Sequence, residues 1–117
     1  MPLKTAITGG IWANPSMGSI WTNYGAPFDP VGYRKDSLGV VYLRGWIVWV
    51  TGANISMFTL PVGFRPTGLK RFLVGGATQQ NAIATSMVEV RANGEVWWQG
   101  YGTYFYIGLD EISFATF

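Results

Sequence analysis

Turn-forming residues interrupt this chain so often that the apolar segments between them are too short for ordinary helices. Glycine accounts for 16 of the 117 residues and proline for six, and no window keeps apolar residues at helical spacing. Short apolar segments separated by Gly, Pro and Asn are typical of antiparallel all-β domains. We therefore predict one all-β domain, an antiparallel β-sandwich of jelly-roll type with roughly eight strands.

The dipeptide Asn93-Gly94 is the clearest local signal in the chain. Both central positions of a tight hairpin turn need positive φ, which Asn and Gly adopt readily. Alternating apolar and polar residues on its two sides predict strands at 82–92 and 95–99. Further strands are expected at 21–24, 40–50, 55–60, 70–74, 104–109 and 112–117, with a break at Gly75-Gly76.

The strand expected at 40–50 is largely apolar on both faces. Val41, Leu43, Ile47 and Trp49 would share one face, and the residues between them would share the other. A strand with two apolar faces is normally covered on both sides. One cover would be the second sheet of the sandwich, and the other could be a neighbouring subunit.

Residues 1–20 differ from the rest because glycines and prolines interrupt any strand pattern. We expect an extended N-terminal arm over 1–20, followed by the β-sandwich domain over 21–117. The arm carries the apolar residues Ile7, Ile11 and Trp12, which we interpret as anchors that dock on a neighbouring subunit or on a larger assembly.

The chain has few charges, and this predicts an oligomer. Charged residues make up 12% of the sequence, about half of the usual share of roughly 25%. Much of the surface must then be apolar or neutral, and such surfaces are often covered by partner subunits. The eight basic residues are scattered, so nucleic acid is not an expected partner. No apolar segment is long enough to predict membrane insertion, and the N-terminal residues lack the pattern of a signal peptide.

The residue types argue against an enzyme. The chain has no histidine and no cysteine, which removes the commonest general base, zinc ligands and thiolate nucleophile. Glu89 and Glu95 would be neighbours across the hairpin, where a structural role is expected. The adjacent acids Asp110 and Glu111 lack the alternating oxygen ligands of a calcium loop. We therefore predict no catalytic residue, no metal and no cofactor.

The aromatic residues are the best candidates for a binding site. Trp97 and Trp98 are neighbours in a predicted strand, so one faces the core and the other faces outward. Together with Tyr101 and Tyr104, the outward indole could stack on sugar rings, which makes these four residues the candidate glycan site. The alternative is that they form core and subunit interface, where aromatic residues are also common.

The loop from Pro61 to Pro66 is expected to have a structural role. Its two prolines restrict the chain, Gly63 permits a positive φ, and Arg65 could bridge carbonyl groups or a carboxylate.

Several short motifs follow one another in a characteristic order between residue 21 and the end of the chain. They are W-x-N-x-G at 21–25, L-x-G at 43–45, L-P-x-G-F-R-P at 60–66, N-G-x-V at 93–96 and L-x-x-I-x-F at 109–114. This order resembles the C-terminal head domain of bacteriophage tail-fibre, minor tail and receptor-binding proteins.

The resemblance implies a homotrimeric virion protein at the tail tip, displayed to a bacterial cell-wall glycan. The N-terminal arm would then attach the domain to other virion proteins of the tail or capsid. Two alternatives stay open: a capsid decoration protein of the same fold, and a stand-alone carbohydrate-binding module.

Overall fold

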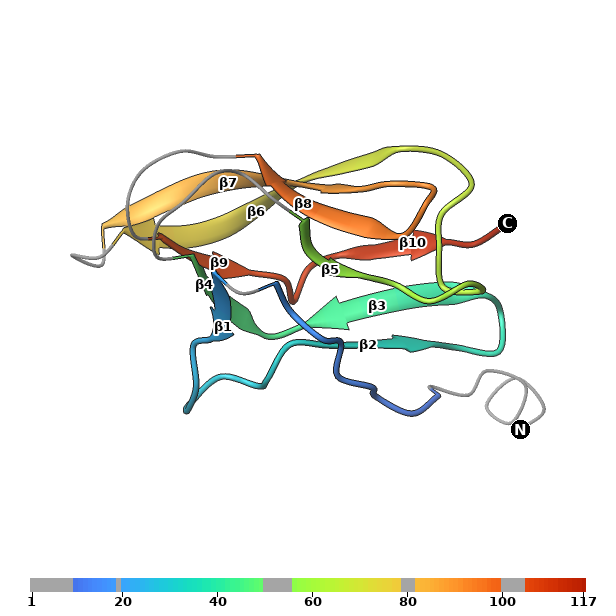
Figure 1. The fold of residues 1–117 in the computed structure, drawn as a ribbon, viewed down its shortest axis with the longest axis horizontal. Coiled ribbons are helices and arrows are strands. Elements are labelled where there is room, and N and C mark those ends of the chain that lie inside the picture. The colour runs from blue at the N-terminus through green and yellow to red at the C-terminus, as the bar shows by residue number, and fades with distance from the viewer. Residues whose placement is uncertain (1–9, 19, 50–55, 79–81, 100–104) are drawn as a thin grey trace, which may run out of the picture.

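Antiparallel strands make up the fold of the described part of the chain, which comprises residues 10–18, 20–49, 56–78, 82–99 and 105–117 of the computed structural model (Figure 1). These residues form ten strands and no helix, and so no helix long and apolar enough to cross a membrane. The predicted all-β antiparallel class is confirmed. The strands are β1 (Trp21–Asn23), β2 (Gly32–Lys35), β3 (Val40–Arg44), β4 (Trp46–Trp49), β5 (Ser56–Thr59), β6 (Lys70–Thr78), β7 (Ile83–Val90), β8 (Glu95–Gln99), β9 (Phe105–Gly108) and β10 (Ser113–Ala115).

The strands form two sheets of unequal size. Seven of them pair in the order β1-β4-β9-β6-β7-β8-β5, and the other three in the order β10-β3-β2. The large sheet curls into a nearly closed barrel that lies beside the small sheet (Figure 1). The backbone N–H of Gly18, just before β1, donates to the carbonyl of Met57 in β5 at 3.0 Å. This bond links the two edges of the curled sheet.

Three indoles pack together in the interior of the barrel. The ring centroid of Trp98 lies 4.8 Å from that of Trp49 and 5.9 Å from that of Trp21. Because these residues belong to β8, β4 and β1, the cluster ties strands from the two halves of the sheet together. The other fully buried apolar side chains include Val41, Leu43, Ile47, Met57, Leu60, Val88, Val90, Val96, Ile107, Leu109 and Ile112.

The continuous strand that we predicted at 40–50 is wrong, because Gly45 divides it. β3 lies in the small sheet and β4 in the large one. Gly45 has a φ of 103°, and a Cβ there would lie 2.7 Å from the backbone of Val31 and the carbonyl of Pro30. The predicted alternation of 41, 43, 47 and 49 nevertheless holds across the bend, since these four side chains are all buried.

The chain crosses between the sheets a second time next to Gly45. β9 pairs with β4 in the large sheet, and β10 pairs with β3 in the small one. The Gly45 N–H donates to the Asp110 carboxylate at 2.8 Å, and the Leu109 N–H donates to the Gly45 carbonyl at 2.9 Å. Two neighbouring strands thus bend together at one hydrogen-bonded corner, and the Asp110 carboxylate stabilises this corner by accepting the Gly45 N–H.

Two further expectations about strands differ from the structure. Gly75-Gly76 does not end its strand, because β6 is the central strand of the large sheet and pairs with β7 and β9 at this point. β2 was not predicted, since Gly32 and the turn residues before it hid a short strand that pairs with β3.

The described part of the N-terminal segment lies along the small sheet. Ala13 and Tyr33 exchange two backbone hydrogen bonds of 2.9 Å. The Trp12 ring makes cation–π contacts with two guanidinium groups, since its centroid lies 4.2 Å from Cζ of Arg44 and 5.1 Å from Cζ of Arg34. Residues 10–18 are therefore anchored on β2 and, through Gly18, on β5.

Substituting Gly45 by alanine tests the corner. We expect Gly45→Ala to lower the free energy of unfolding by more than about 2 kcal/mol, because it combines a strained φ with a backbone clash. Gly75→Ala is the matched control, since a Cβ added at Gly75 would meet nothing within 4 Å. That control should change stability by less than about 1 kcal/mol. Equal losses for the two variants in urea denaturation would contradict the proposed role of Gly45.

A buried carboxylate holds the turn between β2 and β3. Asp36 accepts the N–H groups of Val40 at 3.0 Å and Leu38 at 2.9 Å, and its second oxygen accepts the Tyr42 hydroxyl at 2.9 Å. The hydrogen bond from Val40 is the largest cause that lowers the pKa of Asp36 below 3.8; burial of the carboxyl opposes it, and the bonds from Tyr42 and Leu38 add to it.

This lowered pKa predicts a defined dependence of stability on pH. Because the folded-state pKa lies below the unfolded value of about 3.9, the contribution of Asp36 is complete above about pH 5 and is lost as pH falls through the folded-state pKa. Asp36→Asn should therefore melt at a lower temperature than the wild type at pH 7, with a gap that narrows on acidification. Thermal melts followed by circular dichroism measure this gap, and a gap independent of pH would contradict the assignment.

Candidate functional site

The two middle strands of the large sheet carry apolar side chains on the outside of the barrel. Leu73 of β6 pairs with Met87 of β7, and Ala77 pairs with Ile83, so all four side chains point outward. The exposed fraction is 75% for Leu73 and 97% for Ile83. We call these four residues the outer apolar surface. Several exposed aliphatic side chains gathered on one face of a sheet are typical of a contact with another molecule.

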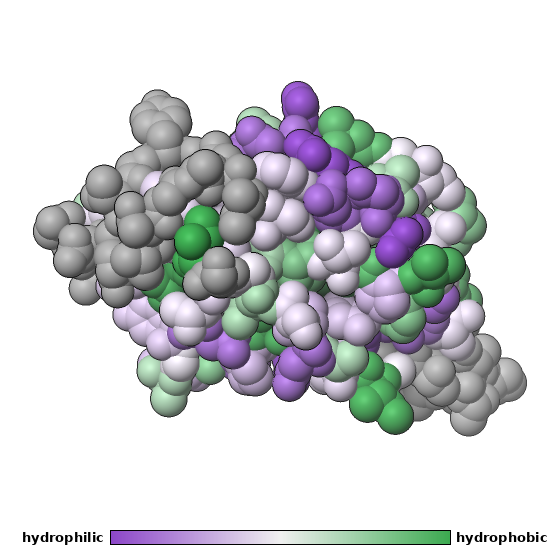
Figure 2. Space-filling model, viewed as in Figure 1, coloured by the Kyte–Doolittle hydropathy of each residue, from purple (hydrophilic) through white to green (hydrophobic). Residues whose placement is uncertain are grey.

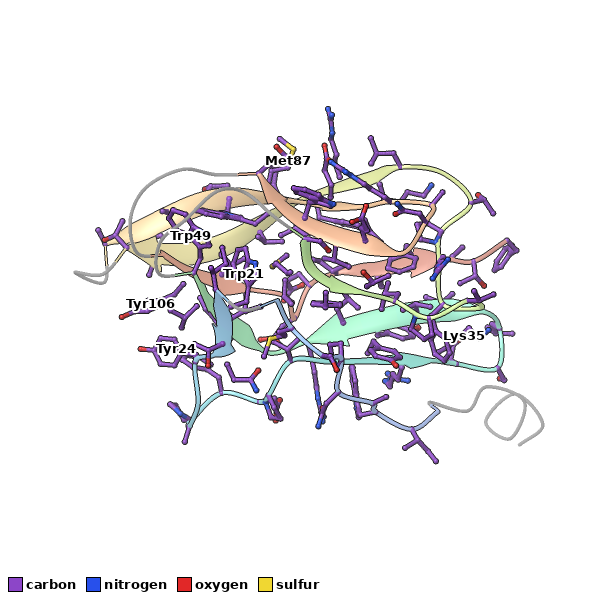
Figure 3. All side chains as sticks on the ribbon, viewed as in Figure 1. Trp21, Tyr24, Lys35, Trp49, Met87 and Tyr106 are labelled. Atoms are coloured by element: carbon purple, nitrogen blue, oxygen red, sulfur yellow. The ribbon has the colours of Figure 1, made fainter. Side chains whose placement is uncertain are left out.

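An aromatic cluster adjoins the outer apolar surface. Tyr24 lies 5.0 Å from Phe28 and 4.7 Å from Tyr106 between ring centroids, and Phe28 lies 5.1 Å from Trp46. Figure 3 shows the rings of Tyr24 and Tyr106 side by side and pointing away from the barrel. Tyr106 is paired with Ala77 across β9 and β6, so the cluster extends the outer apolar surface sideways.

The opposite end of the same hairpin is polar. Glu89 is 5% exposed and accepts from Arg71 at 2.9 Å and from Arg91 at 3.3 Å. The guanidinium of Arg91 lies 4.3 Å from the centroid of Trp97. Hydrophilic side chains gather over this part of β7 and β8 in Figure 2. The expected structural role of Glu89 agrees with these contacts, because each of its two carboxylate oxygens forms an ion pair with an arginine on the surface of the sheet.

A groove lies between the edge strands of the two sheets, and we call it the seam groove. It has a volume of about 620 Å³ and is open to solvent. The N-terminal segment forms one wall, Tyr33 of β2 contributes from the small sheet, and β5 with the following loop forms the other wall. Its lining residues are Asn14, Pro15, Ser16, Met17, Gly18, Tyr33, Ser56, Phe58, Thr59, Leu60, Pro61 and Arg65.

The loop from Pro61 to Pro66 shapes one end of the seam groove. Gly63 has a φ of 94°, the conformation expected for it. Arg65 donates from Nε to the Leu60 carbonyl at 2.9 Å, and Lys35 donates from Nζ to the Gly63 carbonyl at 2.7 Å. These bonds hold two cationic side chains at fixed places on the loop, and Pro66 is buried beneath it.

The residues predicted for glycan binding do not gather in one described site. Trp98 is 1% exposed and belongs to the core, whereas Trp97 is half-buried beneath Arg91. Tyr101 and Tyr104 lie outside the described residues, as does Ile7 of the predicted arm. Of the other arm residues, Trp12 contacts its own chain and Ile11 is 90% exposed.

Sequence reasoning missed the seam groove. Its walls come from three segments that are far apart in the sequence, and no motif links them. Only Pro61 and Arg65 of the predicted loop line it. Since neutral polar residues such as Asn14 and Thr59 are common over the whole surface of a protein, no signal in a single sequence could have distinguished them.

No metal centre is evident in the part of the chain that the structure describes, because its acidic residues form no group of three that could hold an ion. Comparison with known proteins returns no match among protein-family models, curated proteins or solved structures. The geometry of the outer apolar surface and the seam groove therefore carries the functional argument.

The two neighbouring tryptophans predict contrasting effects on stability. Trp98→Ala should lower the free energy of unfolding by about 3–5 kcal/mol, because it opens a cavity beside Trp49 in the barrel interior. Trp97→Ala loses mainly the contact with Arg91 and should cost about 1 kcal/mol. Urea denaturation of the two variants measures this difference, and similar costs would contradict the assignment of the two indoles.

Proposed function

We propose that this protein is a non-enzymatic structural subunit of a bacteriophage virion, a minor tail or tail-tip protein that assembles as a homotrimer. In this proposal the curled large sheet and the small sheet correspond to the jelly-roll-like sandwich of a tail-fibre head domain. The order of motifs between residues 21 and 114 supports the virion assignment. The outer apolar surface supports the self-association.

The exposure of Leu73 and Ile83 is the observation on which the self-association depends. Burying an aliphatic side chain of this size contributes about 1.5–3 kcal/mol relative to leaving it in water. A stable contact buries roughly 800 Å² on each partner, so the surface has to extend beyond these two residues. The adjoining aromatic cluster of Tyr24, Phe28, Trp46 and Tyr106 supplies a suitable extension.

A second candidate function is a stand-alone carbohydrate-binding module, which the seam groove favours. Such a module works as a monomer, so oligomeric mass separates it from the virion subunit. A capsid decoration protein would share the oligomer and differ in its place on the virion, where the exposed Ile11 at the N-terminal segment suits attachment to either tail or capsid proteins.

Charge placed on the outer apolar surface should break the oligomer. We expect the wild type to elute with three times its protomer mass of 12.9 kDa in size-exclusion chromatography with light scattering. Leu73→Glu combined with Ile83→Glu should give the protomer mass, because two carboxylates would be buried without partners.

The matched control is Leu38→Glu combined with Phe117→Glu, which adds the same two charges on residues that are 56% and 80% exposed but lie outside this surface. It should leave the trimer intact. A wild type that stays monomeric at millimolar concentration would remove the assembly proposal in favour of the carbohydrate-binding module.

The place on the virion has its own test. Virions labelled with an antibody against this protein should carry the label at the tail tip in electron micrographs. Label distributed over the capsid would contradict the tail-tip assignment and favour a capsid decoration protein.

A further inference from the structure

We propose that the seam groove binds an anionic carbohydrate, a hydroxyl-rich ligand that carries carboxylate or phosphate groups. The inference deepens the proposed function by assigning it a ligand site, and it rests on that function for its biological setting. The contacts that carry it are those of the groove itself.

The size and shape of the seam groove suit a short saccharide. Its volume of about 620 Å³ lies within the range of roughly 300–1,000 Å³ that is usual for small-molecule sites. The groove is open along the seam between the sheets, so a longer chain could cross it without threading through an enclosed cavity. Its walls are held by backbone hydrogen bonds, from Ala13 to Tyr33 on one side and from Gly18 to Met57 on the other.

The side chains that line the seam groove combine neutral polar groups with apolar faces. Asn14, Ser16 and Thr59 are exposed to solvent at the groove and offer amide and hydroxyl groups that donate and accept hydrogen bonds. Tyr33 is half-buried there, and its ring is held by an edge-on contact of 5.2 Å with Phe64. A sugar has the same combination of hydroxyl groups and apolar C–H faces.

The charge of the seam groove selects an anion. Arg65 is the only charged residue among the described residues that line it, and no carboxylate does so. Within the described residues Arg65 forms no ion pair, and its single hydrogen bond uses Nε on the Leu60 carbonyl. The two terminal nitrogens of the guanidinium are thereby oriented and left to bind a carboxylate or phosphate in a bidentate manner.

A peptide is a poorer occupant than a saccharide. An added peptide strand needs a free sheet edge for its backbone hydrogen bonds. The strand edges beside the groove are already engaged in part, since the Met57 carbonyl of β5 accepts the Gly18 N–H and Tyr33 of β2 exchanges two bonds with Ala13.

Titration followed by ¹H–¹⁵N correlation spectra tests the proposal. The probes are tetragalacturonate, its fully methyl-esterified form, and a glycerol-phosphate oligomer. We expect one of the charged probes to shift the amide signals of the non-proline residues within 14–18 and 59–65, and the neutral ester to bind at least about tenfold more weakly. The carboxylate and phosphate arms then identify which anion the groove prefers.

Three variants locate the site. Arg65→Gln should weaken binding of the charged probe about tenfold, whereas Lys70→Gln removes the same charge from an exposed residue outside the groove and should leave binding unchanged. Thr59→Trp fills the groove from an exposed position, so it should abolish binding in a folded protein even if Arg65→Gln fails to fold.

Several results would overturn the inference: equal binding of the ester, shifts that map to another surface, equal effects of the two charge variants, or no shift with either charged probe at about 10 mM. Its failure is distinct from failure of the proposed function, because Leu73 and Ile83 do not line the groove. If the protein is a trimer that binds neither charged probe, only the ligand proposal is contradicted. If it is a monomer that binds one of them, only the assembly proposal is contradicted.

Discussion

The bend at Gly45 is the constraint on which the rest of the structure depends. Here the chain crosses between the sheets twice, from small to large between β3 and β4 and from large to small between β9 and β10, and hydrogen bonds between Gly45, Leu109 and Asp110 join the two crossings. The backbone of Val31 lies so close to Gly45 that no side chain fits. Because the two crossings are hydrogen-bonded to each other, the angle between the two sheets is set at a single place, and the apolar faces of both sheets are brought against one core.

This arrangement also creates the two surfaces of functional interest. The large sheet curls until its edges are bridged by the Gly18–Met57 hydrogen bond, and the curl presents the outer face of β6 and β7 to the solvent. The small sheet stays beside it, so the edge strands β2 and β5 leave a seam between them. The N-terminal segment lies along that seam and turns it into a groove. The outer apolar surface and the seam groove thus lie on separate parts of one small fold.

The two surfaces differ in the kind of interaction that they can make with another molecule. The outer apolar surface has aliphatic side chains exposed on one face of the large sheet, and their burial is favourable wherever a complementary surface meets them. The seam groove has fixed polar groups and the guanidinium of Arg65, which has no carboxylate partner among the described residues. Such groups provide orientation and specificity more than binding area. A virion subunit that assembles through the first surface and holds a carbohydrate in the second would use each for the task that its chemistry suits.

The sequence by itself determined the strand class, the Asn93-Gly94 hairpin and the shared face of Val41, Leu43, Ile47 and Trp49, because turn chemistry and alternation act between neighbouring residues. It also identified Gly63 as a position where a positive φ is permitted. Only the tertiary structure decided that Gly45 divides a strand between two sheets, that Gly75-Gly76 continues one, and that Trp98 is the indole in the core. These outcomes depend on strands distant in the sequence, such as β9 beside β6 and β1 across from β8. The seam groove was also decided by the tertiary structure alone, since its walls are brought together by the closure of the sheets and not by any local pattern.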